Sequence, residues 1–341
     1  MSENGKKPAL SVIVTNWNAG DIIAGCLKSV CDTVNVPFEI IVVDNASTDA
    51  SVKVVREKFP EAIVIVNDRN TGYSAANNTG FRRASGSYVM FVNPDVVLRP
   101  GAAEKMISFL TANPDVGIIG PEILDGKGNP SFDSKGALPS LCREAAGLFL
   151  IKKAADLARD KLPLFRPFRK KAEEYYRESG ECEFLSGCCM LLESGFCRSL
   201  SGFDEGVPMY LDDIDICFRS RKAGRKNYYL AEAAVLHIKQ HSTKKTGDYR
   251  IYDVLAIKAR DFYYRKHFGE GKAFAYRALV ALAGCFLLLA DALTAPLLLF
   301  GASPREKASV VRKHLMYFAV AFGADVRIEK QGGPRHERAP H

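Results

Sequence analysis

The first 120 residues alternate between short apolar runs and segments in which apolar residues recur at helical spacing. The short runs are rich in β-branched residues and predict five strands, at 9–16, 38–45, 62–68, 88–95 and 116–121. The segments between them predict helices at about 20–30, 47–58, 75–83 and 100–110. For the second of these helices, Ser47 or Thr48 is the expected N-cap. Strands that alternate with helices favour an α/β fold with a mostly parallel sheet covered by helices on both faces.

Polar residues gather where four of these strands end, at Thr15-Asn16, Asp44-Asn45, Asn67-Asp68 and Asn93-Pro94-Asp95. Ligands of such sheets bind beyond the carboxyl ends of the strands, so these four ends predict a polar pocket along one edge. Asp95 is suited to bind a divalent cation, since Mg²⁺ often uses only one or two carboxylates besides substrate phosphates. The structural alternative is an aspartate in the turn after Pro94. Neither the dinucleotide-binding glycine pattern nor the P-loop pattern is present.

Two stretches after these strands suit a nucleotide. The segment from Asp44 to Asp49 fits recognition of a base and a ribose by carboxylates and amides, although an Asx turn with a helix cap also explains it. In residues 70–80 (NTGYSAANNTG), glycines allow close backbone approach, and the two adjacent asparagines are poor helix formers. A helix N-terminus at this point would suit a diphosphate.

The densest acidic cluster lies in YLDDIDICFRSRKAG, residues 210–224. Its apolar residues share one face of a predicted helix. Asp212 and Asp215 have the spacing of N-cap and N3, close to a capping box. That arrangement leaves Asp213 without a structural role, and a carboxylate held at a helix start near a bound sugar can serve as a general base.

The C-terminal third is apolar and basic. Residues 278–300 contain 23 residues with one charge, Asp291, and one proline. As a helix they would extend about 34 Å, enough to cross a membrane. Basic residues flank both ends, whereas a single span should show asymmetric charge, so the pattern favours a broken, re-entrant or interfacial helix pair on one leaflet. The alternative is a buried helix of a soluble domain or of an oligomer interface.

The distribution of charge and the cysteine content bear on the binding partners and the cellular compartment of the protein. Residues 241–341 hold 17 Lys and Arg against nine Asp and Glu, so the net charge of +8 falls entirely there. This surplus is either a solvated basic tail or a region attracted to an anionic surface. The N-terminus lacks the apolar core of a secretory signal, and nine cysteines without metal-binding spacing indicate reduced thiols in the cytosol. Residues 130–182 predict an insertion or a mobile loop.

Five motifs in this order resemble the inverting glycosyltransferases of family 2, in the rhamnosyltransferase-like branch: VDNASTD, NTGYSAANNTG, FVNPDV, SGFDEGVPMYLDDIDICFRSRKAG and AAVLHIKQHS. The resemblance covers about residues 9–243. It implies a GT-A fold with a mixed, mostly parallel Rossmann-like sheet, a nucleotide-diphosphate sugar donor and a Mn²⁺ or Mg²⁺ ion. Candidate donors are dTDP-rhamnose and nucleotide sugars that carry another hexose or a hexosamine. The implied acceptor is a glycan, expected to be lipid-linked, at the inner face of the cell membrane.

The resemblance also implies a role for individual residues. Asp213 corresponds to the catalytic base, and Asp95 and His237 correspond to the metal site. Asn93-Pro94-Asp95 replaces the usual Asp-x-Asp, so Asp95 supplies the remaining carboxylate. Acceptor-side residues are Asp204, Glu205 and Asp212. The donor-binding set is Thr15, Asn16, Asp44, Asn45, Asp49, Asn70, Gly72, Asn77, Asn93 and Asp95.

The predicted organisation is a transferase domain at 1–245 and a helical, membrane-associated region at 246–341. Within the first, 9–120 would bind the nucleotide sugar and 183–243 the acceptor. Two other functions stay open. A sugar-phosphate nucleotidyltransferase would need a glycine-rich basic loop after the first strand, where TNWNAGDI stands instead. A carbohydrate-binding protein without activity would not need the three carboxylates Asp44, Asp95 and Asp213.

Overall fold

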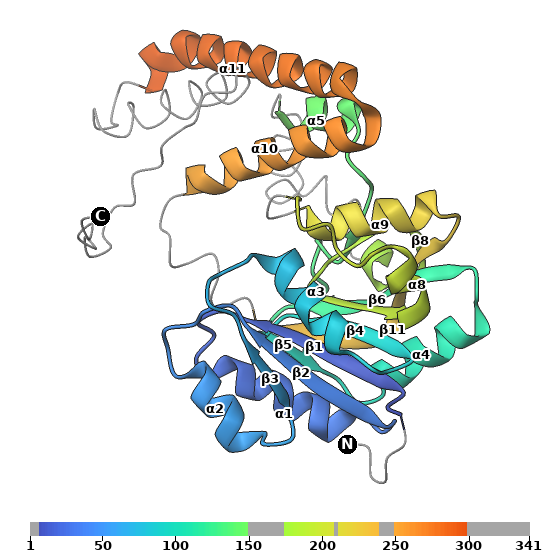
Figure 1. Ribbon diagram of the computed structural model, residues 1–341. Helices are drawn as coiled ribbons and strands as arrows, with labels where there is room; N and C mark the ends of the chain where they lie inside the picture. Colours follow the sequence, from blue (N-terminus) through green and yellow to red (C-terminus); the bar gives the residue numbers. More distant parts are fainter. Residues whose placement is uncertain (1–6, 149–173, 208–210, 239–248, 299–341) are drawn as a thin grey trace. The chain divides into compact units, whose positions relative to one another are not determined.

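Figure 1 shows the computed structural model, which describes residues 7–148, 174–207, 211–238 and 249–298. The chain divides into two compact units. Of the described residues, those up to 140 and those from 174 to 238 form the first unit, and 141–148 with 249–298 form the second.

The described residues of the first unit form a nine-stranded mixed sheet, ordered β3-β2-β1-β4-β10-β6-β11-β5 with β8 paired to β11. Its strands are β1 (Leu10–Asn16), β2 (Phe38–Asp44), β3 (Ile63–Val66), β4 (Tyr88–Val92), β5 (Val96–Leu98), β6 (Val116–Leu124), β8 (Gly180–Cys182), β10 (Cys189–Glu193) and β11 (Lys226–His237). Strands β3, β2, β1, β4, β6 and β11 share one direction, because β10 is antiparallel to both β4 and β6. The predicted mostly parallel α/β sheet is confirmed.

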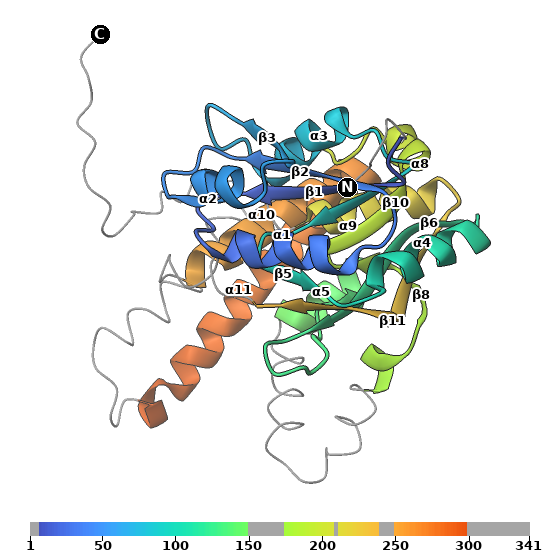
Figure 2. The ribbon, with the colours of Figure 1, turned by 90° about the horizontal axis from the view of Figure 1, so that it is seen from below.

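Helices cover both faces of this sheet because the buried strands alternate their side chains between two cores. Val12 and Val14 pack into the core under α1 (Ile22–Thr33), α2 (Ser51–Lys58) and α4 (Ala102–Ala112). Ile13 packs into the other core, with α3 (Tyr73–Arg83), α8 (Ser194–Ser199) and α9 (Asp212–Lys222). Seen from below, α1 and α4 lie in front of the strands (Figure 2).

Residues 130–182, predicted as an insertion or mobile loop, are described in part. A short second sheet pairs β7 (Lys135–Gly136) with β9 (Phe184–Leu185). Residues 149–173 of this predicted insertion lie outside the described residues. The described part of this range thus contributes β7 and β8 to the first unit and one helix to the second.

The second unit contains α5 (Leu141–Leu148), α10 (Tyr249–Phe268) and α11 (Glu270–Leu298). Arg260 on α10 donates from Nε to Glu144 Oε1 of α5 at 2.8 Å, and Arg277 on α11 pairs with Asp261 at 3.1 Å. Helix α11 runs without interruption to Leu298, so the break predicted within 278–300 is wrong over that range. Among the described residues, no helix has the length and apolar character needed to cross a membrane.

One predicted helix start is also wrong. Helix α2 begins at Ser51 after Ala50, and no side chain caps it, so neither Ser47 nor Thr48 is its N-cap. Their polar groups bind another loop instead. Ser47 Oγ accepts from the backbone N–H of Asn18 at 2.8 Å, and the N–H of Thr48 donates to Asn18 Oδ1 at 2.8 Å. These bonds join the loop after β1 to the loop after β2.

Candidate active site

The carboxyl ends of three strands lie side by side, as predicted. Asn16 at the end of β1 is in register with Asp44 at the end of β2, and Asp44 is in register with Val66 of β3. The chain then continues the pairing beyond the strands, since Asn45 N–H donates to Asn16 O at 2.7 Å and Asn67 N–H donates to Asp44 O at 2.8 Å. This edge therefore presents the loops after β1, β2 and β3 together.

Buried polar bonds hold the first two loops in place. Asn16 and Asp44 are each 1% exposed, and Asn16 Nδ2 donates to Asp44 Oδ1 at 2.6 Å. The other carboxylate oxygen of Asp44 accepts from Ser47 N–H at 2.9 Å. Asp49 accepts from the N–H groups of Gly20 at 2.8 Å and Ser51 at 3.0 Å. Three of the predicted donor-binding residues thus order the loops after β1 and β2 through their side chains.

Asn45 fixes the loop that precedes α3, which contains residues predicted to bind the donor. Its Oδ1 accepts from the N–H of Thr71 at 3.0 Å, and its Nδ2 donates to Asn70 Oδ1 at 2.9 Å and Gly72 O at 3.2 Å. Gly72 has φ +86°, a conformation that favours glycine, and the space where a Cβ would stand is open. The space beside Gly72 is therefore open, and the close backbone approach of a ligand at this glycine stays a prediction.

The two adjacent asparagines of α3 bind groups outside the helix. Asn77 is fully buried and accepts at Oδ1 from Thr15 Oγ1 at 3.4 Å. Asn78 exchanges two hydrogen bonds with the backbone of Phe203, at 2.8 and 2.9 Å, and its Nδ2 donates to Glu205 Oε1 at 3.0 Å. The asparagines of α3 thus link β1 to the loop before α9, and these bonds outweigh the poor helix propensity of asparagine.

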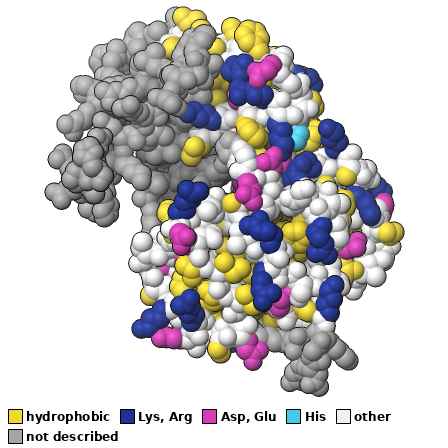
Figure 3. All heavy atoms as spheres, viewed as in Figure 1, with side chains coloured by type: hydrophobic (Ala, Val, Ile, Leu, Met, Phe, Trp, Pro, Cys, Tyr) yellow, Lys and Arg dark blue, Asp and Glu magenta, His cyan; other side chains and the backbone are white. Residues whose placement is uncertain are grey.

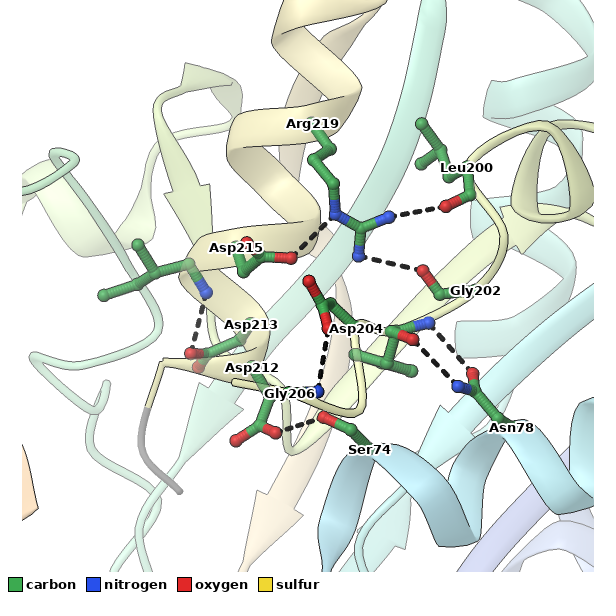
Figure 4. Close-up of polar contacts among 12 residues, drawn as sticks. Ser74, Asn78, Leu200, Gly202, Asp204, Gly206, Asp212, Asp213, Asp215 and Arg219 are labelled. Atoms are coloured by element: carbon green, nitrogen blue, oxygen red, sulfur yellow. Dashed lines mark hydrogen bonds and ion pairs between the residues drawn. The ribbon is translucent and has the colours of Figure 1, made fainter. Parts of the chain in front are cut away.

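The capping box predicted at the start of α9 is wrong. Leu211 occupies the N-cap position, and no side chain caps the helix. Asp212 instead accepts a hydrogen bond from the hydroxyl of Ser74 on α3, and Asp215 forms a buried ion pair with Arg219 at 2.7 Å (Figure 4). Asp212 therefore binds a partner distant in sequence, and Asp215 binds a partner one helical turn away, in place of the predicted local cap.

Asp213 is half-buried and bonded by two backbone groups. Its Oδ2 accepts from Gly187 N–H at 3.0 Å, and its Oδ1 accepts from Ile214 N–H at 2.9 Å. Burial raises the pKa of Asp213; the two N–H groups oppose this shift, and the nearby charge of Asp133 adds to it. A fixed carboxylate with a raised pKa suits a general base near neutral pH.

Asp95 and His237 come together from distant strands. Asp95 precedes β5, which pairs with the end of β11 at His237. His237 Nε2 lies 3.2 Å from Asp95 Oδ1, and both side chains are nearly buried. Within the described ranges, no group of three or more His, Cys, Asp or Glu could hold a metal ion.

The Gly187-Cys188 segment connects the two carboxylates. Gly187 binds Asp213, and Cys188 O accepts from Asn93 N–H at 2.9 Å, two residues before Asp95. Burial raises the pKa of the Cys188 thiol to about 12, and the charges of Asp95 and Asp213 both contribute to this shift. Through these two hydrogen bonds, Asp213 and the turn that leads to Asp95 both meet the Gly187-Cys188 segment.

The other two residues predicted to lie on the acceptor side, Asp204 and Glu205, are in the loop before α9. Asp204 Oδ1 accepts from Gly206 N–H at 2.8 Å, and Glu205 lies 3.7 Å from Arg82 of α3 in addition to its contact with Asn78. Residues 208–210, next in this loop, lie outside the described residues. The described contacts of Asp204 and Glu205 are thus bonds that shape the loop.

Residues 11–196 match the sequence model of the family described as "Glycosyl transferase family 2". The chain belongs to this family. An N-acetylglucosaminyl-diphospho-decaprenol L-rhamnosyltransferase of Mycobacterium tuberculosis is 28% identical over 250 residues, which cover 69% of this chain and 77% of that protein. A mannosyltransferase of Pyrobaculum calidifontis, solved with GDP-Man and Mn²⁺, has a TM-score of 0.55 at 17% identity over 93% of this chain and 87% of that one. The resemblance to family 2 and the GT-A fold are confirmed.

Sequence reasoning missed four residues at the site of this glycosyltransferase. Trp17 follows β1 and is 59% exposed, and its signal was its position as the single tryptophan of the chain at a strand end. Gly187 and Tyr73 contact each other and reach Asp213 only through the tertiary structure. Asp133 acts on the pKa of Asp213 from a loop 80 positions away, for which the sequence held no signal.

Arg219 is expected to contribute most to holding the loop before α9 in place. It donates to the carbonyls of Leu200 at 2.6 Å and Gly202 at 2.8 Å, besides its bond to Asp215, which is 2% exposed (Figure 4). Arg219→Met leaves the buried Asp215 without its charged partner, so the free energy of unfolding should fall by about 3–5 kcal/mol. Urea denaturation followed by circular dichroism measures this loss.

The matched control is Arg221→Met on the same helix. Arg221 pairs with Glu181 at 3.0 Å, but both side chains are substantially exposed. The expected loss there is below about 1 kcal/mol, because solvent screens exposed pairs. Equal losses for the two variants would contradict the importance of the buried pair.

Proposed function

We propose that this protein is an inverting glycosyltransferase. It transfers a sugar from a nucleotide-diphosphate donor to a hydroxyl of a lipid-linked glycan in the synthesis of a cell-surface polysaccharide. The observation that carries the proposal is the pairing of Asp213 with the Gly187-Cys188 segment, which also binds the turn leading to Asp95. The name of the Mycobacterium tuberculosis relative supports a polyprenyl-diphosphate acceptor and makes dTDP-rhamnose the first donor to test.

The reaction is a single displacement at the anomeric carbon. The Asp213 carboxylate takes the proton of the acceptor hydroxyl, and the hydroxyl oxygen forms a bond to the anomeric carbon. The bond from that carbon to the diphosphate oxygen breaks on the opposite side, so the electron pair leaves with the nucleotide diphosphate and the configuration inverts. The backbone N–H groups of Gly187 and Ile214 donate to the Asp213 carboxylate and hold it in place for this proton transfer.

Asp95 and His237 would hold a Mn²⁺ or Mg²⁺ ion. The 3.2 Å between Asp95 Oδ1 and His237 Nε2 fits two neighbouring ligands of an octahedral ion, which lie about 3 Å apart. The other ligands would come from the diphosphate and water, as is usual for these ions. When bound, the ion neutralises charge on the departing diphosphate. The Pyrobaculum calidifontis neighbour, solved with Mn²⁺, supports the choice.

For the donor, we propose a division of labour within the predicted set. Asn16, Asp44, Asn45 and Asp49 shape the donor site through their side-chain hydrogen bonds, and the backbone of Gly72 approaches the donor. The remaining members, Thr15, Asn70, Asn77, Asn93 and Asp95, stay predictions as direct contacts, and so do Asp204, Glu205 and Asp212 for the acceptor. The exposed indole of Trp17 offers a stacking surface for the nucleobase.

We also propose that residues 1–245 form the transferase domain and that 246–341 bind the cytoplasmic surface of the cell membrane. On α11, Ala273, Tyr276, Val280 and Ala283 are buried. Another side of the helix exposes Phe274, Leu282, Phe286 and Leu289 by 48% to 67%, a stripe at helical spacing. Soluble monomers rarely expose such a stripe, and the basic surplus of this region suits anionic lipids. Figure 3 shows hydrophobic and basic side chains together at the surface of the described part of this unit.

Vesicle binding tests the membrane proposal. Serine at positions 274, 282 and 286 (Phe274→Ser, Leu282→Ser, Phe286→Ser) should weaken binding to anionic vesicles at least about 10-fold, because burial of each large apolar side chain contributes about 1.5 kcal/mol or more. Flotation with phosphatidylglycerol vesicles measures the effect. Val66→Ser, an exposed apolar residue of the first unit, is the control. If the triple variant binds vesicles normally but changes oligomeric state, α11 is instead an interface between copies of the chain.

Direct assay tests the transfer reaction. The wild-type protein is incubated with a panel of nucleotide sugars, a polyprenyl-diphosphate GlcNAc acceptor and Mn²⁺, and NMR of the product gives its anomeric configuration. Transfer with inversion is the expected result. Release of pyrophosphate from a nucleoside triphosphate and a sugar phosphate would favour the nucleotidyltransferase alternative. Binding of nucleotide sugars without any turnover would favour the carbohydrate-binding alternative.

A further inference from the structure

Gly187 stands between a tyrosine hydroxyl and the carboxylate of Asp213. Its N–H donates to Asp213 Oδ2 at 3.0 Å, and its carbonyl accepts from the hydroxyl of Tyr73 at 2.6 Å. A Cβ built on Gly187 would lie 3.1 Å from Asp213 Cβ and 3.6 Å from both Asp213 Oδ2 and the Tyr73 hydroxyl. Both side chains therefore pack closely against this one glycine.

Tyr73 itself is fixed from the donor side. It is the first residue of α3 and follows Gly72, whose carbonyl is held by Asn45. Its ring packs edge-on against Phe203, with 5.6 Å between the centroids. Burial, followed by the charges of Asp212 and Asp213, raises the pKa of Tyr73 well above its usual value. The hydroxyl therefore remains protonated and acts as a donor to Gly187.

We propose that Tyr73 is a positioning residue for the base, an inference that rests on the proposed role of Asp213. The Tyr73 hydroxyl holds Gly187, and the Gly187 N–H holds the Asp213 carboxylate in the orientation that accepts the proton. Because Tyr73 continues directly from the donor loop, the same chain of bonds aligns the base with the donor. Tyr73 touches no reacting atom in this scheme and acts only through Gly187.

The Tyr73→Phe variant tests this role, because it removes one hydroxyl and keeps the ring against Phe203. The expected result is a fall in kcat of about 10-fold, the usual scale for a lost hydrogen bond that orients a charged group. The KM for the donor and the melting temperature should stay close to the wild-type values. Tyr88→Phe is the matched control, since the Tyr88 hydroxyl also makes one hydrogen bond, to Thr111 Oγ1 at 2.8 Å. Wild-type kcat in Tyr73→Phe, or an equal fall in the control, would overturn the proposal.

A glycine substitution and a double variant make the test independent of folding effects. Gly187→Ala should lower kcat at least as much, because its Cβ meets Asp213, whereas Gly25→Ala, with no atom within 4 Å of the added Cβ, should not. In the Asp213→Asn background, Tyr73→Phe should have no further effect, since both act through one base. A further fall of about 10-fold in that background would show that Tyr73 acts elsewhere. Full activity in the Asp213→Asn variant would show that Asp213 is not the base, so the proposed function would lose its base assignment. Loss of activity in Asp213→Asn together with full activity in Tyr73→Phe would overturn only the positioning role of Tyr73.

Discussion

Asp213→Asn is expected to lower kcat by about 100-fold or more, the scale of general base catalysis. The amide keeps the shape of the side chain but cannot take a proton from the acceptor hydroxyl. Donor binding should change little, because the described contacts of Asp213 are with Gly187 and Ile214. Steady-state transfer assays give kcat, and calorimetric titration with the nucleotide diphosphate gives the donor affinity. The control is Asp115→Asn, an exposed residue paired with Lys226 at 2.8 Å.

The pH dependence of the wild-type enzyme belongs to the same prediction. The base must be deprotonated, so kcat/KM should fall as the pH drops through the pKa of Asp213. Burial raises that pKa, so this fall should occur at a higher pH than for an exposed aspartate. Asp213→Asn should remove this acidic limb from its residual activity. A variant that retains wild-type turnover would show that another group removes the proton.

Asp95→Asn is expected to abolish activation by Mn²⁺ and to lower kcat/KM by about 100-fold. Asparagine can keep the contact with His237 but removes the negative charge that a hard cation requires. The measurement is activity as a function of Mn²⁺ concentration, together with titration of Mn²⁺ into the complex with nucleotide diphosphate. Asp32→Asn, which removes an exposed carboxylate paired with Lys28, is the control. An unchanged Mn²⁺ response in Asp95→Asn would rule out Asp95 as a metal ligand.

The local pattern was sufficient where the deciding interactions are themselves local. Apolar runs became β1, β2, β4 and β6, because a strand buried on both faces needs only a continuous apolar stretch, and another short run became the partly exposed edge strand β3. Apolar residues at helical spacing also predicted α1, α3 and α4, and the observed bounds lie within a few residues of the predicted ones. The positions of Asp44 and Asp95 at strand ends followed directly from the strands.

Prediction failed where a polar side chain could choose between a local and a distant partner. Ser47 and Asp212 both have the residue type and spacing of helix caps, yet Ser47 binds Asn16 and Asn18, and Asp212 binds Ser74. A cap contributes only about 1 kcal/mol, so a buried partner from another loop outweighs it. The sequence carries no sign of that competition because the partners lie up to 138 positions apart.

The sequence by itself predicted five of the strands, the helices between them and the three candidate carboxylates Asp44, Asp95 and Asp213, because short-range apolar periodicity and family motifs encode them. Only the tertiary structure decided how those carboxylates are held. Tyr73 and Gly187 are 114 positions apart, and neither residue type is unusual where it stands. Their contact arises because α3 packs on the sheet that contains β10, and β10 begins just after Gly187. Contacts made by packing leave no local pattern in the chain.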